Sequence, residues 1–413
     1  MTPAPLSRNA AENLRHPGFH HSGNTPAGGI RARLLALTLA ALALWAPSLP
    51  ASAQATGDLG LVVERASGSL LVVDQSERAS IGRITGLGDL SHASLVYAPD
   101  ERFAYVFGRD GGLTKVDILA QTVVNRVMQA GNSIGGAISD DGRFVAVSNY
   151  EPGGVRIFDA ETLAMVADIP TDSKTIGLVD IPGSRFVFSL WDTGETWIAD
   201  LSGGTPQITR IKGMGAYPYD ALVTGDGRTY IAGLFGEDHL SALDLWQESP
   251  KPRRILPGYA KGRAGLPVYK MPHLEGWALA GQDFVLPAMG QHEVLWVDAR
   301  NLEETGRTPT HGQPVFAMSR PDGRHVWVNF AHPLNDTVQV IDSVTKAVIH
   351  KFTPGPGVLH MEFTPRGHEV WLSVRDAGKV MIYDTETFEK LGEITAESPS
   401  GIFFTARAHR MGL

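Results

Sequence analysis

The chain of 413 residues contains no cysteine. This absence excludes a disulfide framework, a thiolate-bound metal and the Cys-x-x-Cys-His motif through which c-type haem is attached covalently. The folded protein must therefore be stabilised by packing alone.

Several nucleotide- and metal-binding motifs are missing as well. There is no P-loop, no glycine-rich dinucleotide fingerprint that leads into a helix, and no calcium-loop spacing. Residues 131–135 read GNSIG and match the G-x-S-x-G nucleophile pattern. That elbow requires a strand that turns into a helix, whereas this segment links two repeat units. Nucleotide binding and serine hydrolase chemistry therefore have no support in the sequence.

An apolar run, Leu34–Trp45, lies near the N-terminus, with arginines before it and Ala-Ser-Ala at 51–53 after it. This order is typical of a cleaved secretory signal. We expect residues 1–53 to be removed, so that the mature protein begins near Gln54 in the periplasm. The run is too short to span a bilayer as a helix, and an uncleaved anchor is the alternative.

Basic residues are outnumbered, with 36 Lys and Arg against 44 Asp and Glu and a formal net charge of −8 at pH 7. Removal of residues 1–53 takes away more basic than acidic side chains, so the mature chain is more acidic still. A surface for nucleic acid or anionic membrane is therefore not expected, and neither is a membrane span in the mature form.

Turn residues are abundant, with 46 Gly and 26 Pro, and they recur in a unit of a little over forty residues. Each unit has a short apolar strand, a Pro/Asp/Gly turn followed by Arg, a strand rich in Val and aromatic residues, a polar loop and a strand that ends in Asp. Residues 95–117 and 136–159 read LVYAPDERFAYVFGRDGGLTKVD and GAISDDGRFVAVSNYEPGGVRIFD. The turn residues reverse the chain between antiparallel strands. With a fourth strand added, the unit is a propeller blade.

The units add up to eight blades. Six are clear, and a degenerate seventh, FVLPAMGQHEVLWVD, follows an insertion from Pro252 to Gly276. We expect the two ends to share the eighth blade, because GDLGLVVERASGSLLVVD offers outer strands and SPSGIFFTAR an innermost one. Such sharing closes the ring and leaves no free sheet edge. The sequence thus predicts an all-β fold, an eight-bladed β-propeller of four-stranded blades over residues 54–413, with seven blades as the alternative.

Two sets of loops emerge on one face of a propeller: those that enter the innermost strands and those between the second and third strands. Residues from both sets converge on one ligand. His92 enters the first complete unit, and Arg109 lies in the Gly-Arg-Asp-Gly loop of the same unit. We expect these two side chains to be neighbours above the central channel.

The segment that holds both residues, GDLSHASLVYAPDERFAYVFGRDGGLTKVD, resembles the cytochrome cd1 nitrite reductases. In that family a His, a turn, an aromatic strand and Gly-Arg-Asp-Gly precede another strand. The similarity extends through most of the predicted mature chain, and EVWLSVRDAGKVMIYDTETFEKLGEI is especially similar to the family's last full blade. Because a c-type haem domain is absent, the chain is more similar to the NirF family, periplasmic haem d1 biogenesis proteins that consist of the d1-type propeller alone.

The resemblance implies roles for individual residues. His92 would be the axial ligand of the haem iron through a neutral imidazole nitrogen, and Arg109 would bind a carboxylate of the macrocycle bidentately. His273, in KMPHLEG, falls where the reductases have one distal catalytic histidine. Arg320 stands where they have the second, which argues against nitrite reduction and leaves Arg320 to hold an anionic substituent. The alternative is that His92 is an ordinary hydrogen-bonded loop residue and that Arg109 is a solvated surface arginine or a partner for Asp110.

Five further polar residues are candidates because of their place in the units. Four lie in loops predicted on the same face as His92, and one lies just inside an innermost strand: Asn149, Lys174, Asp172, Asp220 and His360. Asp172 and Asp220 are candidate general bases if the protein is an enzyme, and the sequence does not rank them. Core packing is the alternative for His360.

The leading hypothesis is a periplasmic protein that binds haem d1, or a late dihydro-haem d1-like precursor, non-covalently. It would act in maturation of the tetrapyrrole or in its delivery to nitrite reductase, together with other haem d1 maturation proteins. Whether it is an enzyme, such as an oxidoreductase, or only a carrier stays open. The alternative from another class is a docking platform for partner proteins. Direct nitrite reduction is a third and weaker hypothesis, because electron delivery through a c-type haem is missing.

Overall fold

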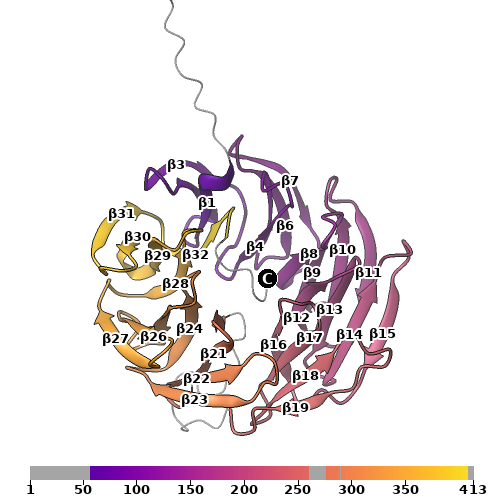
Figure 1. Ribbon diagram of the computed structural model, residues 1–413. Helices are drawn as coiled ribbons and strands as arrows, with labels where there is room; N and C mark the ends of the chain where they lie inside the picture. The colour runs from indigo at the N-terminus through magenta and orange to yellow at the C-terminus, as the bar shows by residue number, and fades with distance from the viewer. Residues whose placement is uncertain (1–55, 260–275, 289, 408–413) are drawn as a thin grey trace, which may run out of the picture. The chain divides into compact units, whose positions relative to one another are not determined.

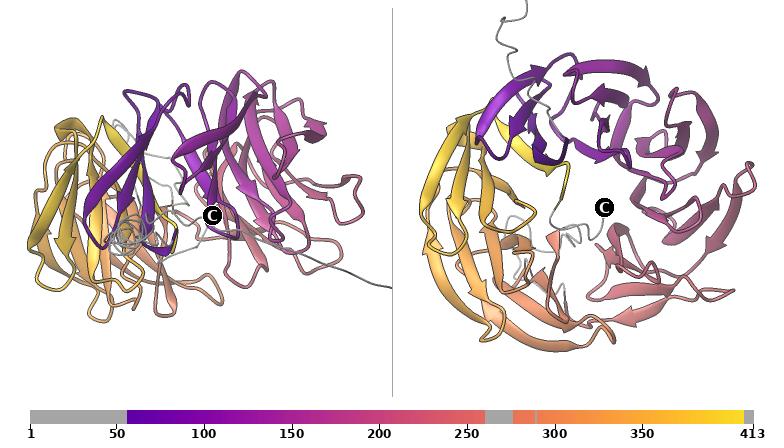
Figure 2. Two further views of the ribbon diagram at one scale, coloured as in Figure 1. Left: turned by 90° about the horizontal axis from the view of Figure 1, so that it is seen from above. Right: turned by 45° about the horizontal axis from the view of Figure 1, so that its top comes forward.

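A computed structural model describes residues 56–259, 276–288 and 290–407. Its strands form eight four-stranded antiparallel sheets, which surround a common axis as the blades of a propeller (Figure 1). In each blade one strand lies nearest the axis and the next three follow outward (Figure 2). The prediction of an eight-bladed ring of four-stranded blades is confirmed, and the seven-bladed alternative is wrong.

The blades are numbered in ring order, with strands given from the axis outward. Blade 1 has β32 (Pro399–Phe404), β1 (Leu59–Glu64), β2 (Ser69–Asp74) and β3 (Ala79–Ile84); blade 2 has β4 (Ser94–Tyr97), β5 (Phe103–Phe107), β6 (Gly112–Asp117) and β7 (Thr122–Met128); blade 3 has β8 (Asn132–Ile138), β9 (Phe144–Glu151), β10 (Gly154–Asp159) and β11 (Met165–Pro170); blade 4 has β12 (Thr175–Ile181), β13 (Arg185–Leu190), β14 (Glu195–Asp200) and β15 (Gln207–Ile211). Blade 5 has β16 (Pro218–Val223), β17 (Thr229–Leu234), β18 (Leu240–Asp244) and β19 (Arg253–Ile255); blade 6 has β20 (Ala278–Ala280), β21 (Asp283–Ala288), β22 (Glu293–Asp298) and β23 (Glu304–Pro309); blade 7 has β24 (Pro314–Ser319), β25 (His325–Phe330), β26 (Val338–Asp342) and β27 (Ala347–Phe352); blade 8 has β28 (Val358–Phe363), β29 (Glu369–Val374), β30 (Lys379–Asp384) and β31 (Lys390–Thr395). Short 3-10 helices are η1 (Thr56–Asp58) and η3 (Arg375–Ala377).

Blade 1 is built from both ends of the propeller, as the sequence predicts. The C-terminal strand β32 pairs antiparallel with β1, with Gly60 opposite Phe404 and Val62 opposite Ile402. Figure 2 shows the yellow β32 against the indigo strands of the N-terminal segment. The pairing satisfies the backbone groups of β1 that an open ring would expose as a sheet edge.

The core consists of apolar layers between neighbouring blades, one for each junction around the ring. Successive residues of a strand point to opposite faces of its sheet, so each middle strand contributes to two layers. In β29, Val370 and Leu372 pack toward blade 7, while Trp371 between them packs toward blade 1. Burial on both faces explains why the middle strands read as apolar runs instead of alternating with polar residues.

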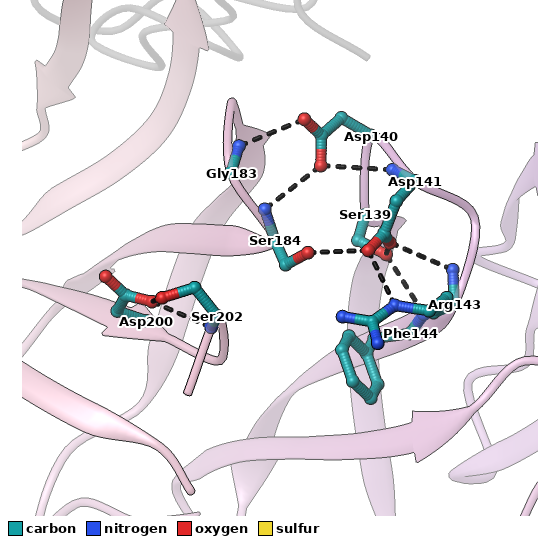
Figure 3. Close-up of polar contacts among 9 residues, drawn as sticks. All are labelled: Ser139, Asp140, Asp141, Arg143, Phe144, Gly183, Ser184, Asp200 and Ser202. Atoms are coloured by element: carbon teal, nitrogen blue, oxygen red, sulfur yellow. Dashed lines mark hydrogen bonds and ion pairs between the residues drawn. The ribbon is translucent and has the colours of Figure 1, made fainter. Parts of the chain in front are cut away.

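Hydrogen bonds join blades 3 and 4 through the turns that connect the innermost strand of each blade to its second strand. In the β8–β9 turn, the Asp140 carboxylate accepts the backbone N–H groups of Gly183 and Ser184 in the β12–β13 turn, both at 3.0 Å (Figure 3). The neighbouring Asp141 accepts the Ser184 hydroxyl at 2.6 Å and the Arg143 guanidinium at 2.7 Å. Blades 3 and 4 are therefore joined by charge-assisted bonds as well as by apolar packing.

The hydrogen bonds of Asp141 should make the stability of the fold depend on pH. Burial alone would raise the pKa of Asp141, but hydrogen bonds from Ser139, Ser184 and Arg143 outweigh it and hold the pKa below the usual 3.8. A lowered folded-state pKa adds stability above the unfolded-state value, and that stability is lost as pH falls through the folded pKa. We expect Asp141→Asn to have a lower urea midpoint of unfolding than the parent protein at pH 7. Below pH 4 the two midpoints should lie closer together. Equal midpoints at pH 7 would contradict this role.

The predicted signal segment, residues 1–53, and His273 lie outside the described residues. No helix in the described part of the chain is long and apolar enough to cross a membrane.

Candidate functional site

A cavity of about 370 Å³ lies at the centre of the ring, between the inner strands. Its wall is largely aliphatic and aromatic, with Phe316 and Phe403 among the aromatic side chains. A few polar residues interrupt this wall, among them His92, Asp220 and His360. An apolar pocket of this size with a small number of polar groups is typical of a small-molecule or cofactor site.

Bulges in the inner strands direct adjacent residues into this cavity. Between Pro218 and Ala221, β16 advances three residues while its partner β17 advances two, and both residues in between, Tyr219 and Asp220, line the cavity. Corresponding register shifts occur in β12, β24 and β28. Regular pleating would turn one residue of each pair away, so the bulges create the wall.

The two loop sets named in the sequence analysis do meet on one face. A residue just after a blade's second strand donates its N–H to the loop that enters the inner strand. This donor is the first residue after the strand in blades 4, 5, 7 and 8 and the second residue in blade 2. The pairs are Arg109 to Asp89, Trp191 to Lys174, Phe235 to Tyr217, Ala331 to Gln313 and Arg375 to Gly357, at 2.8 to 2.9 Å. The repetition of this bond fixes the loops around the cavity mouth.

His92 lies at this mouth on the β3–β4 loop and is exposed. The loop is anchored by Leu87 and Leu90, which are buried in the layer between blades 1 and 2. The carboxylate of Asp89 accepts the Ser91 N–H at 2.8 Å. These contacts hold the backbone of the loop that carries His92 at the mouth of the cavity.

Asp110 of the Gly-Arg-Asp-Gly loop holds the β3–β4 loop in place. Its carboxylate pairs with Arg126 at 2.6 Å and accepts the N–H groups of Asp89 and Gly112 at 3.3 and 3.0 Å. Gly111 is required here, because its φ is +84° and an added Cβ would lie 1.8 Å from the carbonyl oxygen of Ala130. Asp110 thus pairs with Arg126 and not with Arg109, contrary to the alternative stated for the sequence.

The guanidinium of Arg109 lies 5.7 Å from the ring centroid of Tyr150. Tyr150 shares a hydrogen bond with Tyr219 of the cavity wall, and burial raises the pKa of Tyr150, opposed by Tyr219 and Arg109. Arg109 is thus adjacent to the cavity through these two tyrosines, and it is not itself among the wall residues.

His360 and Asp220 are the other predicted residues that the structure brings to the cavity. The Nδ1 atom of His360 accepts the N–H of Ile402 at 3.2 Å, and its ring lies between Phe316 and Phe403, with centroids 5.6 and 5.8 Å away. A neutral His360 therefore carries its proton on Nε2, which suits it to donate a hydrogen bond more than to ligate iron.

Besides Arg109, four predicted residues are not among those that line the cavity. Arg320 lies in the β24–β25 turn at the opposite end of the inner strand and pairs with Glu386 and Asp322 at 2.9 and 3.3 Å. Asn149 is buried and exchanges two hydrogen bonds with Gln129. The other two, Asp172 and Lys174, are exposed on the loop that enters β12.

Sequence reasoning missed two arginines of the cavity wall, Arg65 and Arg407. Arg407 pairs with the fully buried Glu362 at 3.2 Å. It also lines a second cavity, of about 260 Å³, among the turns at the other end of the channel. There, burial raises the pKa of Asp180 to about 6. Arg65 lies in the β1–β2 turn, a member of the second loop set, so the topology rule could have found it.

Comparison with known proteins agrees with this geometry. Residues 54–408 match the family model described as Cytochrome D1 heme domain. The chain is 55% identical to Protein NirF of Stutzerimonas stutzeri over 91% of this chain and 99% of that protein. It is 56% identical to Protein NirF of Pseudomonas aeruginosa over 92% and 98% of the two chains.

Among solved structures, the chain is similar to the dihydro-heme d1 dehydrogenase NirN in complex with DHE. The TM-score is 0.76 at 26% identity, over 87% of this chain and 78% of that one. The chain belongs to the NirF group of the Cytochrome D1 heme domain family, as the resemblance in its sequence predicts.

Proposed function

We propose that this protein binds haem d1 or a late dihydro-haem d1-like precursor, without a covalent bond, in its central cavity. We propose further that it acts in the periplasm in the maturation of this tetrapyrrole or in its delivery to nitrite reductase. The observation that carries the proposal is the apolar cavity with His92 exposed at its mouth. The solved NirN structure, whose propeller is similar and which holds DHE, supports it.

The residues present fit a tetrapyrrole. Apolar and aromatic wall residues such as Phe316 and Phe403 suit the macrocycle, and burial of that surface favours binding. The imidazole of His92 can supply an axial nitrogen, and the bound iron would supply redox chemistry. Arg109, whose guanidinium lies beside the Tyr150 ring near the mouth, suits an acidic substituent there.

Proton transfer, if the protein is an enzyme, is assigned to Asp220 in preference to Asp172. The bulge in β16 places Asp220 on the cavity wall, whereas Asp172 is exposed on the loop outside it. A general base must lie within hydrogen-bond reach of the proton that it takes. Nitrite reduction gains no support, because Arg320 lies at the far end of its strand in two ion pairs.

The proposal is tested by a spectroscopic titration of the purified protein with haem d1. We expect a saturable change in the visible spectrum of the haem at one equivalent, because the described residues surround one cavity at the centre of the ring. Quenching of tryptophan fluorescence should follow the same curve. Serum albumin at the same concentration controls for non-specific uptake. The absence of any spectral change would reject the proposal and favour the docking platform.

A further inference from the structure

Two fully buried glutamates differ in how their carboxylates are hydrogen-bonded. Glu64 and Glu362 have relative exposures of 0% and 1%. The Glu64 carboxylate accepts bonds at 2.6 to 2.9 Å from Arg83, from the Ser69 hydroxyl and from the backbone N–H of Glu397. Burial would raise the pKa of Glu64, but these bonds outweigh it and lower the pKa. A buried glutamate thus stays ionised here because several donors meet it.

Glu362 has much less support for its charge. Its Oε2 atom accepts one bond from Arg407 at 3.2 Å, and its Oε1 atom has no hydrogen-bond partner among the described residues. The same holds for the Nε atom of Arg407. A buried ion pair offsets its desolvation only when the remaining donors and acceptors are satisfied. Burial accordingly raises the pKa of Glu362, and Arg407 opposes this rise without cancelling it. This carboxylate is therefore prepared to accept a proton.

Glu362 lies between the two cavities of the channel. It follows His360 of the central cavity by two positions on β28, about 7 Å along the strand. Its partner Arg407 lines both cavities. Tyr97 and Glu101, which line the second cavity from blade 2, are the other titratable side chains near this ion pair among the described residues. A change in the charge of Glu362 therefore acts on both cavities.

The second cavity offers a route for protons from the face opposite to His92. Asp140 and Asp180 are among the residues that line it. Burial and the nearby charge of Asp140 raise the pKa of Asp180 to about 6, so Asp180 exchanges protons close to neutral pH. A polar cavity of about 260 Å³ has room for water that connects such groups. Protons can thus reach the level of Glu362 without passing the mouth.

A ligand that fills the central cavity from the His92 side displaces water from it and covers the mouth. The loss of this water makes the surroundings of Glu362 less polar and favours its neutral form. We propose that Glu362 takes up a proton through the second cavity when the tetrapyrrole fills the central cavity. The proton converts the carboxylate to a carboxylic acid and ends its ion pair with Arg407. The inference rests on the proposed function and deepens it, because it makes ligand binding depend on a proton at a residue outside the cavity wall.

The first test is a titration with haem d1 between pH 6 and pH 9. If binding takes up one proton, the parent should bind more weakly as pH rises, by up to about tenfold per pH unit. Glu362→Gln mimics the neutral carboxyl group, so it should keep tight binding across this range. Glu389→Gln is the matched control, because Glu389 is exposed in the β30–β31 loop of the same blade and should keep the parental dependence. Protonation of His92 would weaken binding as pH falls, which is the opposite direction.

Infrared difference spectra between loaded and free protein observe the proton itself. The parent should gain the C=O band of a carboxylic acid and lose a carboxylate band, and Glu362→Gln should show neither change. Arg407→Gln removes the positive charge that keeps Glu362 ionised, so Glu362 should already be protonated before the ligand binds and the difference band should shrink. In stopped-flow mixing with a pH-indicator dye, Asp180→Asn should slow the uptake without changing the number of protons.

The outcomes separate the inference from the proposed function. If the parent binds haem d1 with one affinity at every pH and shows no carboxylic acid band, the function stands and the role of Glu362 is overturned. Parental pH dependence in Glu362→Gln overturns it as well. If Asp180→Asn takes up the proton at the parental rate, the route through the second cavity is overturned. If the parent binds no haem d1 at any pH, the proposed function fails together with the inference. Arg407→Gln keeps the test decisive if Glu362→Gln does not fold.

Discussion

His92→Ala should weaken binding of haem d1 by at least about tenfold and remove the spectral features of nitrogen ligation from the bound form. The imidazole is exposed at the mouth of the cavity. The loop that carries it is held by Leu87 and Leu90. The variant should therefore fold normally, and the loss should be confined to the ligand. The measurement is the same titration, followed by visible absorbance and low-temperature electron paramagnetic resonance.

Two controls define this result. His368→Ala removes an exposed histidine from the β28–β29 turn at the other end of the channel and should leave binding unchanged. Free imidazole added to His92→Ala should restore the nitrogen-ligated spectrum, because the small ligand can occupy the space of the deleted ring. A variant with parental affinity and spectrum would reject His92 as the ligand and leave the cavity itself as the binding site.

The ring architecture was predictable because the signals that define a blade are local and repeated. A turn residue, an apolar strand and a closing Asp recur in every unit, so errors in one unit are corrected by the others. The shared blade was predictable for a related reason: the first and last segments each lack strands that the other supplies. The weakest unit, blade 6, still forms a sheet, although its inner strand β20 spans only Ala278–Ala280.

The candidate site was predictable only where loop position decides which way a residue faces. His92 meets this condition. Arg320 does not meet it. Its role was transferred by resemblance, whereas the turn that holds it follows an inner strand and emerges on the face of the propeller opposite to His92. Arg65 was missed because the first segment was considered for ring closure alone, although its loop corresponds to the loop of Arg109. The bulge that turns both Tyr219 and Asp220 into the cavity has no signal in a strand pattern of period two.

Phe404→Ala should be the most damaging single substitution for stability among those considered, with a loss of about 3 to 5 kcal/mol in the free energy of unfolding. Phe404 is fully buried in the layer between blades 8 and 1 and lies edge-on to Trp371, with ring centroids 5.3 Å apart. Its ring also occupies the space left by Gly60 on the paired strand, where an added Cβ would lie only 2.5 Å from Phe404 Cδ1. Truncation would leave a cavity at the point where the chain closes its own ring.

Urea denaturation followed by tryptophan fluorescence measures this effect, with Phe235→Ala as the matched control. Phe235 is 37% exposed, so its truncation removes less buried surface than that of Phe404 and should shift the midpoint less. Gly60→Val should destabilise in the same direction as Phe404→Ala, because the added side chain competes with the Phe404 ring for one space. If Phe404→Ala and Phe235→Ala have equal midpoints, the contact between β1 and β32 is not what holds the ring closed. Stability would then reside in the other seven blade junctions, each of which is formed by strands that follow one another along the chain.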